Sequence, residues 1–316
     1  MLTSDSTYPH PNEPVDAEPQ FDGEACGLTL SCPEADLFVP DGEEPRAALA
    51  RTTHLGIVAH QDDLEIAAYH GIAECYQQAD RWFAGVVLTD GGGSPRTGRY
   101  AKHSDSEMRA VRRREQRKAA VVGEYGAVLQ LGWASSVVKR GDTGLVTDEL
   151  RQLLLLTRPE VVYLHNPTDR HDTHVACFWR AMEALRSLPA EARPRRVYGC
   201  EVWRKLDWLV AADKQLLRVD QHPNLALPLV GVFDSQIVGG KRYDLAEDGL
   251  RRANATYFDS HTTDGATQLS FAMDLTPLVI NPSLDISEFT LGFVDRLRAD
   301  VEERLHRYGP GSSYVG

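Results

Sequence analysis

Residues 56–72 read GIVAHQDDLEIAAYHGI, and the change of pattern inside this stretch decides the fold. Residues 53–60, THLGIVAH, have an apolar centre and the length expected for a buried β-strand. From Asp62 onward, apolar residues recur at helical spacing between polar ones. A buried strand that turns directly into an amphipathic helix is the typical start of a βαβ unit.

The same alternation continues along the chain. Further strands are predicted at residues 83–89, 127–132, 161–166 and 195–203. Helices are predicted between them at residues 106–125, 147–158 and 173–188, with a strand and turn at 227–238 and a solvent-facing helix at 241–258. Strands that alternate with helices of this length predict an α/β fold: a three-layer α/β/α sandwich with a mostly parallel, Rossmann-like sheet.

The negative charge of the chain is concentrated at its start. The chain has a formal net charge of −12, and residues 1–50 contribute −10 of it, with eleven acidic residues and Arg46 as the one base. Such an acidic, Pro-rich stretch is typical of a partly disordered segment. The sequence therefore predicts an N-terminal segment at residues 1–50 and one large domain at residues 51–316. This domain has no basic stripe, which argues against nucleic acid as a partner.

The sequence also favours a cytoplasmic protein. No apolar run is long enough to span a bilayer, and the first residues lack the basic start and apolar stretch of a secretory signal. The five cysteines are widely spread and form no CxxC pair, as expected for reduced thiols. We therefore expect no membrane partner. Oligomeric state is not specified, so a homo-oligomer stays open.

Polar residues of metal-binding type follow the predicted strands. Ligands of parallel sheets bind at the carboxyl ends of the strands, so a site is expected at these positions. The residues concerned are His60, Asp62, Asp63, Asp90, His165, Asn166, His171 and His174. Each alone has an ordinary explanation, because Asp caps helix starts and histidines near a helix start are commonly exposed. Their convergence on one edge of the sheet favours a metal site.

The spacing of these residues suits zinc. His60 and Asp63 flank a tight strand-to-helix turn, so both side chains can reach one ion. Zinc accepts imidazole nitrogen and carboxylate oxygen, and a catalytic zinc has three protein ligands and one open position. The HDTH stretch can provide the third ligand from His171 or His174, and the other histidine would then stand beside the open position. The expected cofactor is Zn²⁺, with another divalent transition metal as the alternative.

AHQDD at residues 59–63 and HDTHVA at residues 171–176 resemble the motifs of the LmbE-like, or PIG-L, family of zinc-dependent N-deacetylases. The first motif of that family is AHPDDE, and the second has the form HxDH at a helix start. Between them the family shows a strand ending in LT, a glycine turn, and RxxE before an Ala-rich helix. Here the corresponding features are VVLTDGGG at residues 86–93, then Arg112 and Glu115.

The resemblance implies a role for each polar residue of the two motifs. His60, Asp63 and His174 would be the zinc ligands, Asp62 the general base, and His171 the group that assists the oxyanion or the leaving amine. Zinc lowers the pKa of its bound water toward ~7, so that hydroxide is available at neutral pH. The implied reaction is hydrolysis of an N-acylated amine. The implied substrate is a small-molecule N-acetylglucosamine-type sugar or its conjugate.

The chain departs from the family pattern at three places. Gln61 replaces the usual proline, which alters the stiffness of the turn but removes no ligand. Leu64 stands where the family has Glu, and the neighbouring Glu65 should point elsewhere on the helix. In the second motif Thr173 stands where the family has an acid that orients a histidine, so Asp169 is a candidate to replace that acid.

Two further residues are candidates for substrate binding. Asp90 ends a strand at the expected active edge and could accept a hydrogen bond from a sugar hydroxyl, or cap the glycine turn. Arg96 lies in that turn and could contact the substrate, although a loop arginine is commonly solvated.

Two other classes of function stay open. One is a Rossmann-type enzyme that binds a nucleotide or S-adenosylmethionine at the DGGG turn, although the chain has neither GxGxxG after a strand nor a P-loop. The other is a non-catalytic binding protein with a structural zinc. A structural site would be closed by four ligands, and Asp62 would then be an unneeded carboxylate beside them.

Overall fold

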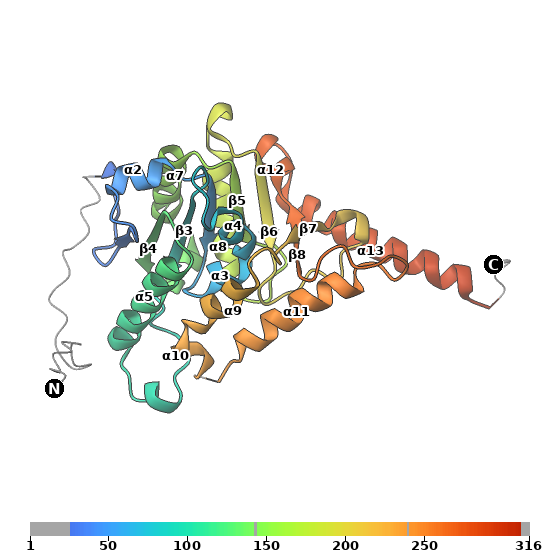
Figure 1. Ribbon diagram of the computed structural model, residues 1–316. Helices are drawn as coiled ribbons and strands as arrows, with labels where there is room; N and C mark the ends of the chain where they lie inside the picture. The colour runs from blue at the N-terminus through green and yellow to red at the C-terminus, as the bar shows by residue number, and fades with distance from the viewer. Residues whose placement is uncertain (1–25, 142–143, 239, 311–316) are drawn as a thin grey trace, which may run out of the picture.

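An eight-stranded sheet forms the centre of the computed structural model, which describes residues 26–141, 144–238 and 240–310 (Figure 1). The strand order is β1-β4-β3-β2-β5-β6-β8-β7. The strands are β1 (Asp36–Phe38), β2 (His54–Val58), β3 (Phe83–Thr89), β4 (Ala127–Trp133), β5 (Val161–His165), β6 (Arg196–Cys200), β7 (Gln215–Arg218) and β8 (Leu269–Asp274). The five strands from β4 to β6 pair in parallel, whereas β1, β7 and β8 pair antiparallel with their neighbours.

Helices cover both faces of this sheet. They are α2 (Pro45–Ala50), α3 (Asp63–Ala67), α4 (Tyr69–Cys75), α5 (Asp105–Val122), α6 (Ser135–Arg140), α7 (Leu145–Thr157), α8 (Asp172–Arg186), α9 (Pro223–Gly231), α10 (Asp234–Ile237), α11 (Tyr243–Tyr257), α12 (Thr276–Ile280) and α13 (Ile286–Tyr308). The prediction of a three-layer sandwich with a mostly parallel sheet is confirmed.

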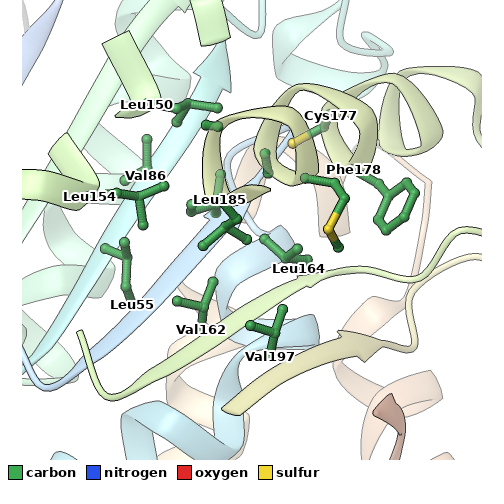
Figure 2. Close-up of a cluster of buried hydrophobic side chains, with 14 of the residues drawn as sticks. Leu55, Val86, Leu150, Leu154, Val162, Leu164, Cys177, Phe178, Leu185 and Val197 are labelled. Carbon is green, nitrogen blue, oxygen red and sulfur yellow. The ribbon is translucent and has the colours of Figure 1, made fainter. Parts of the chain in front are cut away.

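Two hydrophobic clusters lie on the two faces of the sheet, because successive strand residues point to opposite sides. Val58 and Val87 belong to the cluster beneath α3, α4, α5 and α9. The other cluster lies beneath α7, α8 and α12, and Figure 2 shows its centre. The residues labelled there are Leu55, Val86, Leu150, Leu154, Val162, Leu164, Cys177, Phe178, Leu185 and Val197.

The topology places a crevice at the carboxyl ends of β2 and β5. β2 lies between β3 and β5, so the chain leaves β2 toward one side of the sheet and later returns on the other. Ligands of open parallel sheets bind at such a switch point. His60 follows β2 by two residues, and His165 is the last residue of β5. The polar residues named from the sequence therefore meet at this point.

The end of the chain differs from the sequence prediction. The strand and turn predicted at residues 227–238 are wrong, because this segment lies in the helices α9 and α10. Leu225 and Leu229, four residues apart, are buried against the layer that contains α5. A helix that is apolar on several sides has no clear period, so it resembles a buried strand in the sequence. The helix predicted at residues 241–258 is present as α11, and its inner face buries Glu247 and Arg251.

The described part of the predicted N-terminal segment packs against the domain. β1 pairs with β4, and Cys26, Leu28 and Leu49 are buried in the core. Residues 1–25 lie outside the described residues, and the domain division at residue 50 stays a prediction. Within the ranges that the structure covers, none of the helices has the length and apolar character needed to cross a membrane.

Candidate metal centre

Three side chains from the crevice bring their ligand atoms together. Nδ1 of His60 lies 3.1 Å from Oδ2 of Asp63 and 3.1 Å from Nε2 of His174, and the remaining side of this triangle, from His174 Nε2 to Asp63 Oδ2, is 3.2 Å. Ligand atoms bound to a tetrahedral zinc at about 2.0–2.2 Å lie ~3.3–3.6 Å from one another. The triangle is therefore close to one face of a zinc coordination tetrahedron. The residues fit a divalent cation.

A tight turn between β2 and α3 places two of the three side chains. The backbone N–H of His60 donates to Oδ2 of Asp63 at 2.8 Å, and the N–H of Asp63 donates to the carbonyl of His60 at 3.2 Å. These two hydrogen bonds fold the chain back between the strand and the helix. Burial would raise the pKa of Asp63, but the imidazoles of His174 and His165 hold it well below its usual range. A carboxylate that stays ionised suits a metal ligand.

His174 lies in the first turn of α8 and is fully buried. Its Nδ1 lies 3.4 Å from Oδ2 of Asp169, whose side chain has no exposed surface. Burial would lower the pKa of His174, but the carboxylates of Asp63 and Asp169 raise it to about 9. In the metal-free protein this imidazole therefore holds a proton between two carboxylates. A cation bound at Nε2 would replace that proton.

His165 lies beside these groups, but its contacts exclude it from the ligand set. Its ring stacks on that of His174, with ring centres 3.9 Å apart, and its Nε2 is 3.5 Å from Oδ2 of Asp63. The backbone N–H of Ala59 donates to this Nε2 at 2.9 Å, so the lone pair that would bind a metal is occupied. Burial lowers the pKa of His165 to about 4, which keeps the ring neutral. His165 supports the position of His174.

Asp62 lines the cavity together with two of the candidate ligands, His60 and Asp63. Its backbone adopts a left-handed conformation, with φ of 94°, which a residue other than glycine rarely takes. Its N–H donates to Oε1 of Gln116 at 3.3 Å, and its Oδ1 lies 3.3 Å from the guanidinium of Arg112. Burial raises the pKa of Asp62 to about 6, although Arg112 acts in the opposite direction. A carboxylate with a raised pKa suits proton transfer near neutral pH.

His171 stands on the other side of the triangle. Its ring centre is 4.9 Å from that of His60 and 4.6 Å from that of His174, so its nitrogens also come within ligand distance of theirs. Burial, together with His174 and His60, lowers the pKa of His171. The ring stacks against Trp203, with ring centres 6.5 Å apart and an angle of 21° between the planes. His171 therefore presents a neutral imidazole to the cavity wall.

A cavity of about 510 Å³ opens beside these residues. Its lining includes His60, Asp62, Asp63 and His171, together with residues of the glycine turn after β3, of α6, and of α11 with the loop before it. Glycine is needed at position 91 so that the turn after β3 can lie against Gln61. The φ of Gly91 is 71°, and a Cβ there would lie 2.5 Å from Gln61 Oε1. This volume holds a small organic molecule.

The two predicted substrate-binding residues have different positions. Asp90 lines the cavity, but its carboxylate is bound to Arg109 Nε at 2.8 Å and accepts the N–H of Gly92 at 2.9 Å. The guanidinium of Arg96 is engaged with Asp105 and with the carbonyl of Gly92, and its side chain is not among those that line the cavity.

Several cavity residues were not assigned a role from the sequence. Arg112 belongs to the RxxE pattern, which could have indicated its contact with Asp62. Trp203 lies beside His171 and lines the cavity. Lys139 and Tyr243 had no sequence signal, since nothing in their local pattern shows that α6 and α11 meet at this cavity.

Comparisons with known proteins give a match to a family model. The family model described as "PIG-L: GlcNAc-PI de-N-acetylase" matches residues 55–185. A comparison with curated proteins finds no match.

Solved structures with the same architecture include three that cover most of the chain. The conserved protein TT1542 from Thermus thermophilus is 20% identical with a TM-score of 0.55, over 74% of this chain and 99% of that one. The N,N'-diacetylchitobiose deacetylase from Pyrococcus horikoshii is 16% identical with a TM-score of 0.58, over 75% and 88%. GalB, the 4-carboxy-2-hydroxymuconate hydratase from Pseudomonas putida, is 16% identical with a TM-score of 0.52, over 71% and 96%. At these identities the likeness establishes the fold alone.

Proposed function

This chain carries a domain of the PIG-L (LmbE-like) family at residues 55–185, and on that premise we propose that it is a zinc-dependent N-deacetylase. The reaction is hydrolysis of the acetyl group, or another acyl group, from an N-acylated amine. The proposed substrate is an N-acetylglucosamine-type sugar or conjugate, for which the cavity of about 510 Å³ has sufficient room.

The arrangement of Asp62 beside the ligand triangle is the main support for catalysis. His60, Asp63 and His174 would hold the cation, which when bound supplies a water of lowered pKa and polarises the amide carbonyl. Asp62 lines the same cavity and is not part of the triangle, so its carboxylate, which contacts Arg112 through Oδ1, can accept the proton of the attacking water. A purely structural zinc site would not need this carboxylate, whose burial costs free energy of desolvation.

His171 would act on the opposite side of the reacting amide. Its pKa is lowered, so its imidazole is neutral at pH 7. A neutral imidazole still offers one N–H, which can hydrogen-bond to the developing oxyanion or to the leaving nitrogen. Asp62, once protonated, is then the proton source for the departing amine. Because the pKa of Asp62 is about 6, this carboxyl can both take up and release a proton near neutral pH.

Acetate release from a panel of N-acetylated amino sugars tests this proposal, with and without a chelator. Asp62→Asn should keep stoichiometric zinc and lose most of its turnover, by roughly 10²–10⁴-fold for a general base. Asp172→Asn is the matched control, since Asp172 is exposed and does not line the cavity. Zinc-independent turnover, or full activity of the Asp62→Asn variant, would contradict the assignment.

Analysis of the purified protein separates the other two classes of function. A bound nucleotide without a metal would favour a Rossmann-type binding enzyme. Stoichiometric zinc without hydrolysis of any acetamido sugar would favour a binding protein.

A further inference from the structure

The carboxylates that line the cavity already have partners. Four are present on the lining, and each contacts a cationic group or belongs to the ligand triangle. They are Asp63 in the triangle, Asp62 with Arg112 at 3.3 Å, Asp90 with Arg109 at 2.8 Å, and Glu247 with Lys205 at 2.7 Å. No acidic group of the lining is therefore left to neutralise a further cation.

Two cations of the cavity wall have no such partner. Lys139 and Lys241 both line the cavity, and neither forms an ion pair with a carboxylate among residues 26–141, 144–238 and 240–310. The lining has equal numbers of acidic and basic side chains. A divalent cation at the ligand triangle would replace the proton of His174 and so add a net charge of about +1. The loaded cavity is therefore electropositive, and it favours an anion.

Lys241 is held on the wall that contains His171. Its Nζ lies 5.3 Å from the ring centre of Trp203, within the range of a cation–π contact. The same Trp203 ring stacks against His171 and meets Tyr243 edge-on, with ring centres 6.2 Å apart. The ammonium group is thus positioned by an aromatic side chain that contacts the proposed catalytic residue. Because Lys241 is exposed, its ammonium group is hydrated and can bind an anionic oxygen in place of water.

Lys139 comes from a different part of the fold. It lies on α6 four residues after Ser135, so the two side chains share one face of the helix, and both line the cavity. A serine hydroxyl and a lysine ammonium are both hydrogen-bond donors to an anionic oxygen. Two segments that are 102 positions apart, at residues 139 and 241, therefore bring unpaired donors to one cavity.

We propose that the substrate is an N-acylated amino sugar with an anionic substituent, a phosphate or a carboxylate, which Lys139 and Lys241 bind. This inference rests on the proposed deacetylase function and adds the chemical class of the substituent. The amide group would lie at Asp62 and His171, and the anionic group would extend toward the lysines along the same cavity.

Binding of three sugars to the full-length, zinc-loaded protein tests this inference by calorimetry. The sugars are methyl N-acetylglucosaminide, which is neutral, N-acetylglucosamine 1-phosphate, and an N-acetylglucosaminide with a carboxylate aglycone. We expect at least one of the anionic sugars to bind about tenfold more tightly than the neutral one at low salt. The preference should decline as the salt concentration rises. A comparison of the two anionic sugars shows whether the site prefers phosphate or carboxylate.

Variants of Lys139 and Lys241 test whether these two side chains cause the preference for anionic sugars. Lys139→Gln with Lys241→Gln should lower the ratio of anionic to neutral affinity about tenfold. Lys118→Gln is the matched control, because Lys118 is an exposed lysine of α5 outside the cavity. Circular dichroism and zinc content verify that the double variant is folded.

Equal binding of the three sugars, no binding of either anionic sugar, or an unchanged ratio in the double variant would overturn the inference. Acetate release is followed in parallel. An anionic preference in binding without any hydrolysis counts against the deacetylase function and leaves the assignment of the anion site standing.

Discussion

Asp169 and His174 form a contact behind the ligand triangle: Oδ2 of the carboxylate lies 3.4 Å from Nδ1 of the imidazole, while Nε2 of the same ring faces Asp63 at 3.2 Å. The same Oδ2 accepts the backbone N–H of Trp203 at 3.2 Å, and Oδ1 accepts that of His171 at 3.0 Å. One buried carboxylate therefore links a proposed ligand, the proposed hydrogen-bond donor and the aromatic wall. Carboxylates in this position fix the orientation of a metal-binding imidazole.

Asp169→Asn should weaken zinc binding by roughly 10- to 100-fold, because an amide cannot hold the imidazole orientation as an ionised carboxylate does. The affinity is measured by competition with a chromogenic chelator. Asp172→Asn provides the control, since that residue is exposed. An unchanged zinc affinity in Asp169→Asn would show that this contact has no part in holding the metal.

Zinc binding should release at least one proton near pH 7.5, because His174 is protonated in the metal-free protein and a bound imidazole is neutral. The pKa of His174 is about 9, so apparent zinc affinity should rise with pH up to that value. Asp63 is ionised already and contributes no proton. Calorimetry in buffers with different ionisation enthalpies measures the number of protons released. Heats that do not depend on the buffer would refute the prediction.

Glu65 should make the stability of the metal-free protein depend on pH. It is fully buried, and its Oε1 accepts hydrogen bonds from Tyr125 at 2.6 Å and Gln116 at 2.8 Å. Burial raises its pKa to about 7 from 4.5, so the folded state binds the proton more tightly than the unfolded state. The stabilisation from this proton is complete below pH 4.5 and is lost as pH rises toward 7, in total about 3 kcal/mol.

Glu65→Gln keeps an oxygen acceptor for both donors and removes the titration. Urea unfolding of the chelator-treated proteins at pH 5 and pH 8 measures the effect. The wild type should lose more stability than the variant between these two values. Groups that do not interact with Glu65 titrate equally in both proteins, so the difference between the two reports on Glu65 and on its interaction with Asp62. Parallel pH profiles would contradict the raised pKa.

Gly91→Ala should lower the free energy of unfolding by about 1–3 kcal/mol, since left-handed backbone is strained for alanine and the new methyl would meet Gln61. Gly93→Ala is the matched control in the same turn, where a Cβ meets nothing within 4 Å. Its effect should stay within about 0.5 kcal/mol. Chemical unfolding with a chelator present compares the two variants. Similar stabilities would show that the glycine turn tolerates a side chain at position 91.

The local sequence pattern was sufficient to predict the parallel strands at the centre of the sheet. The strand predicted at residues 53–60, which the structure has at His54–Val58, and the helix after it could be predicted because hydrophobic periodicity reports how each segment is buried. His60 and Asp63 could be grouped from spacing alone, since a tight turn constrains residues close in sequence. Their grouping with His174 required one further rule, that the carboxyl ends of parallel strands share an edge.

Other features depended on contacts between distant segments. β7 and β8 join the sheet by antiparallel pairing, and residues 223–237 form helices in a buried layer, which their own apolar pattern does not reveal. His165 has the chemistry of a ligand, yet a hydrogen bond from Ala59 occupies its Nε2. The sequence by itself determined which residues could bind a metal, because chemistry and spacing are local properties. Only the tertiary structure decided which of them face one another and that Lys139 and Lys241 share their cavity, because packing of remote segments sets those distances.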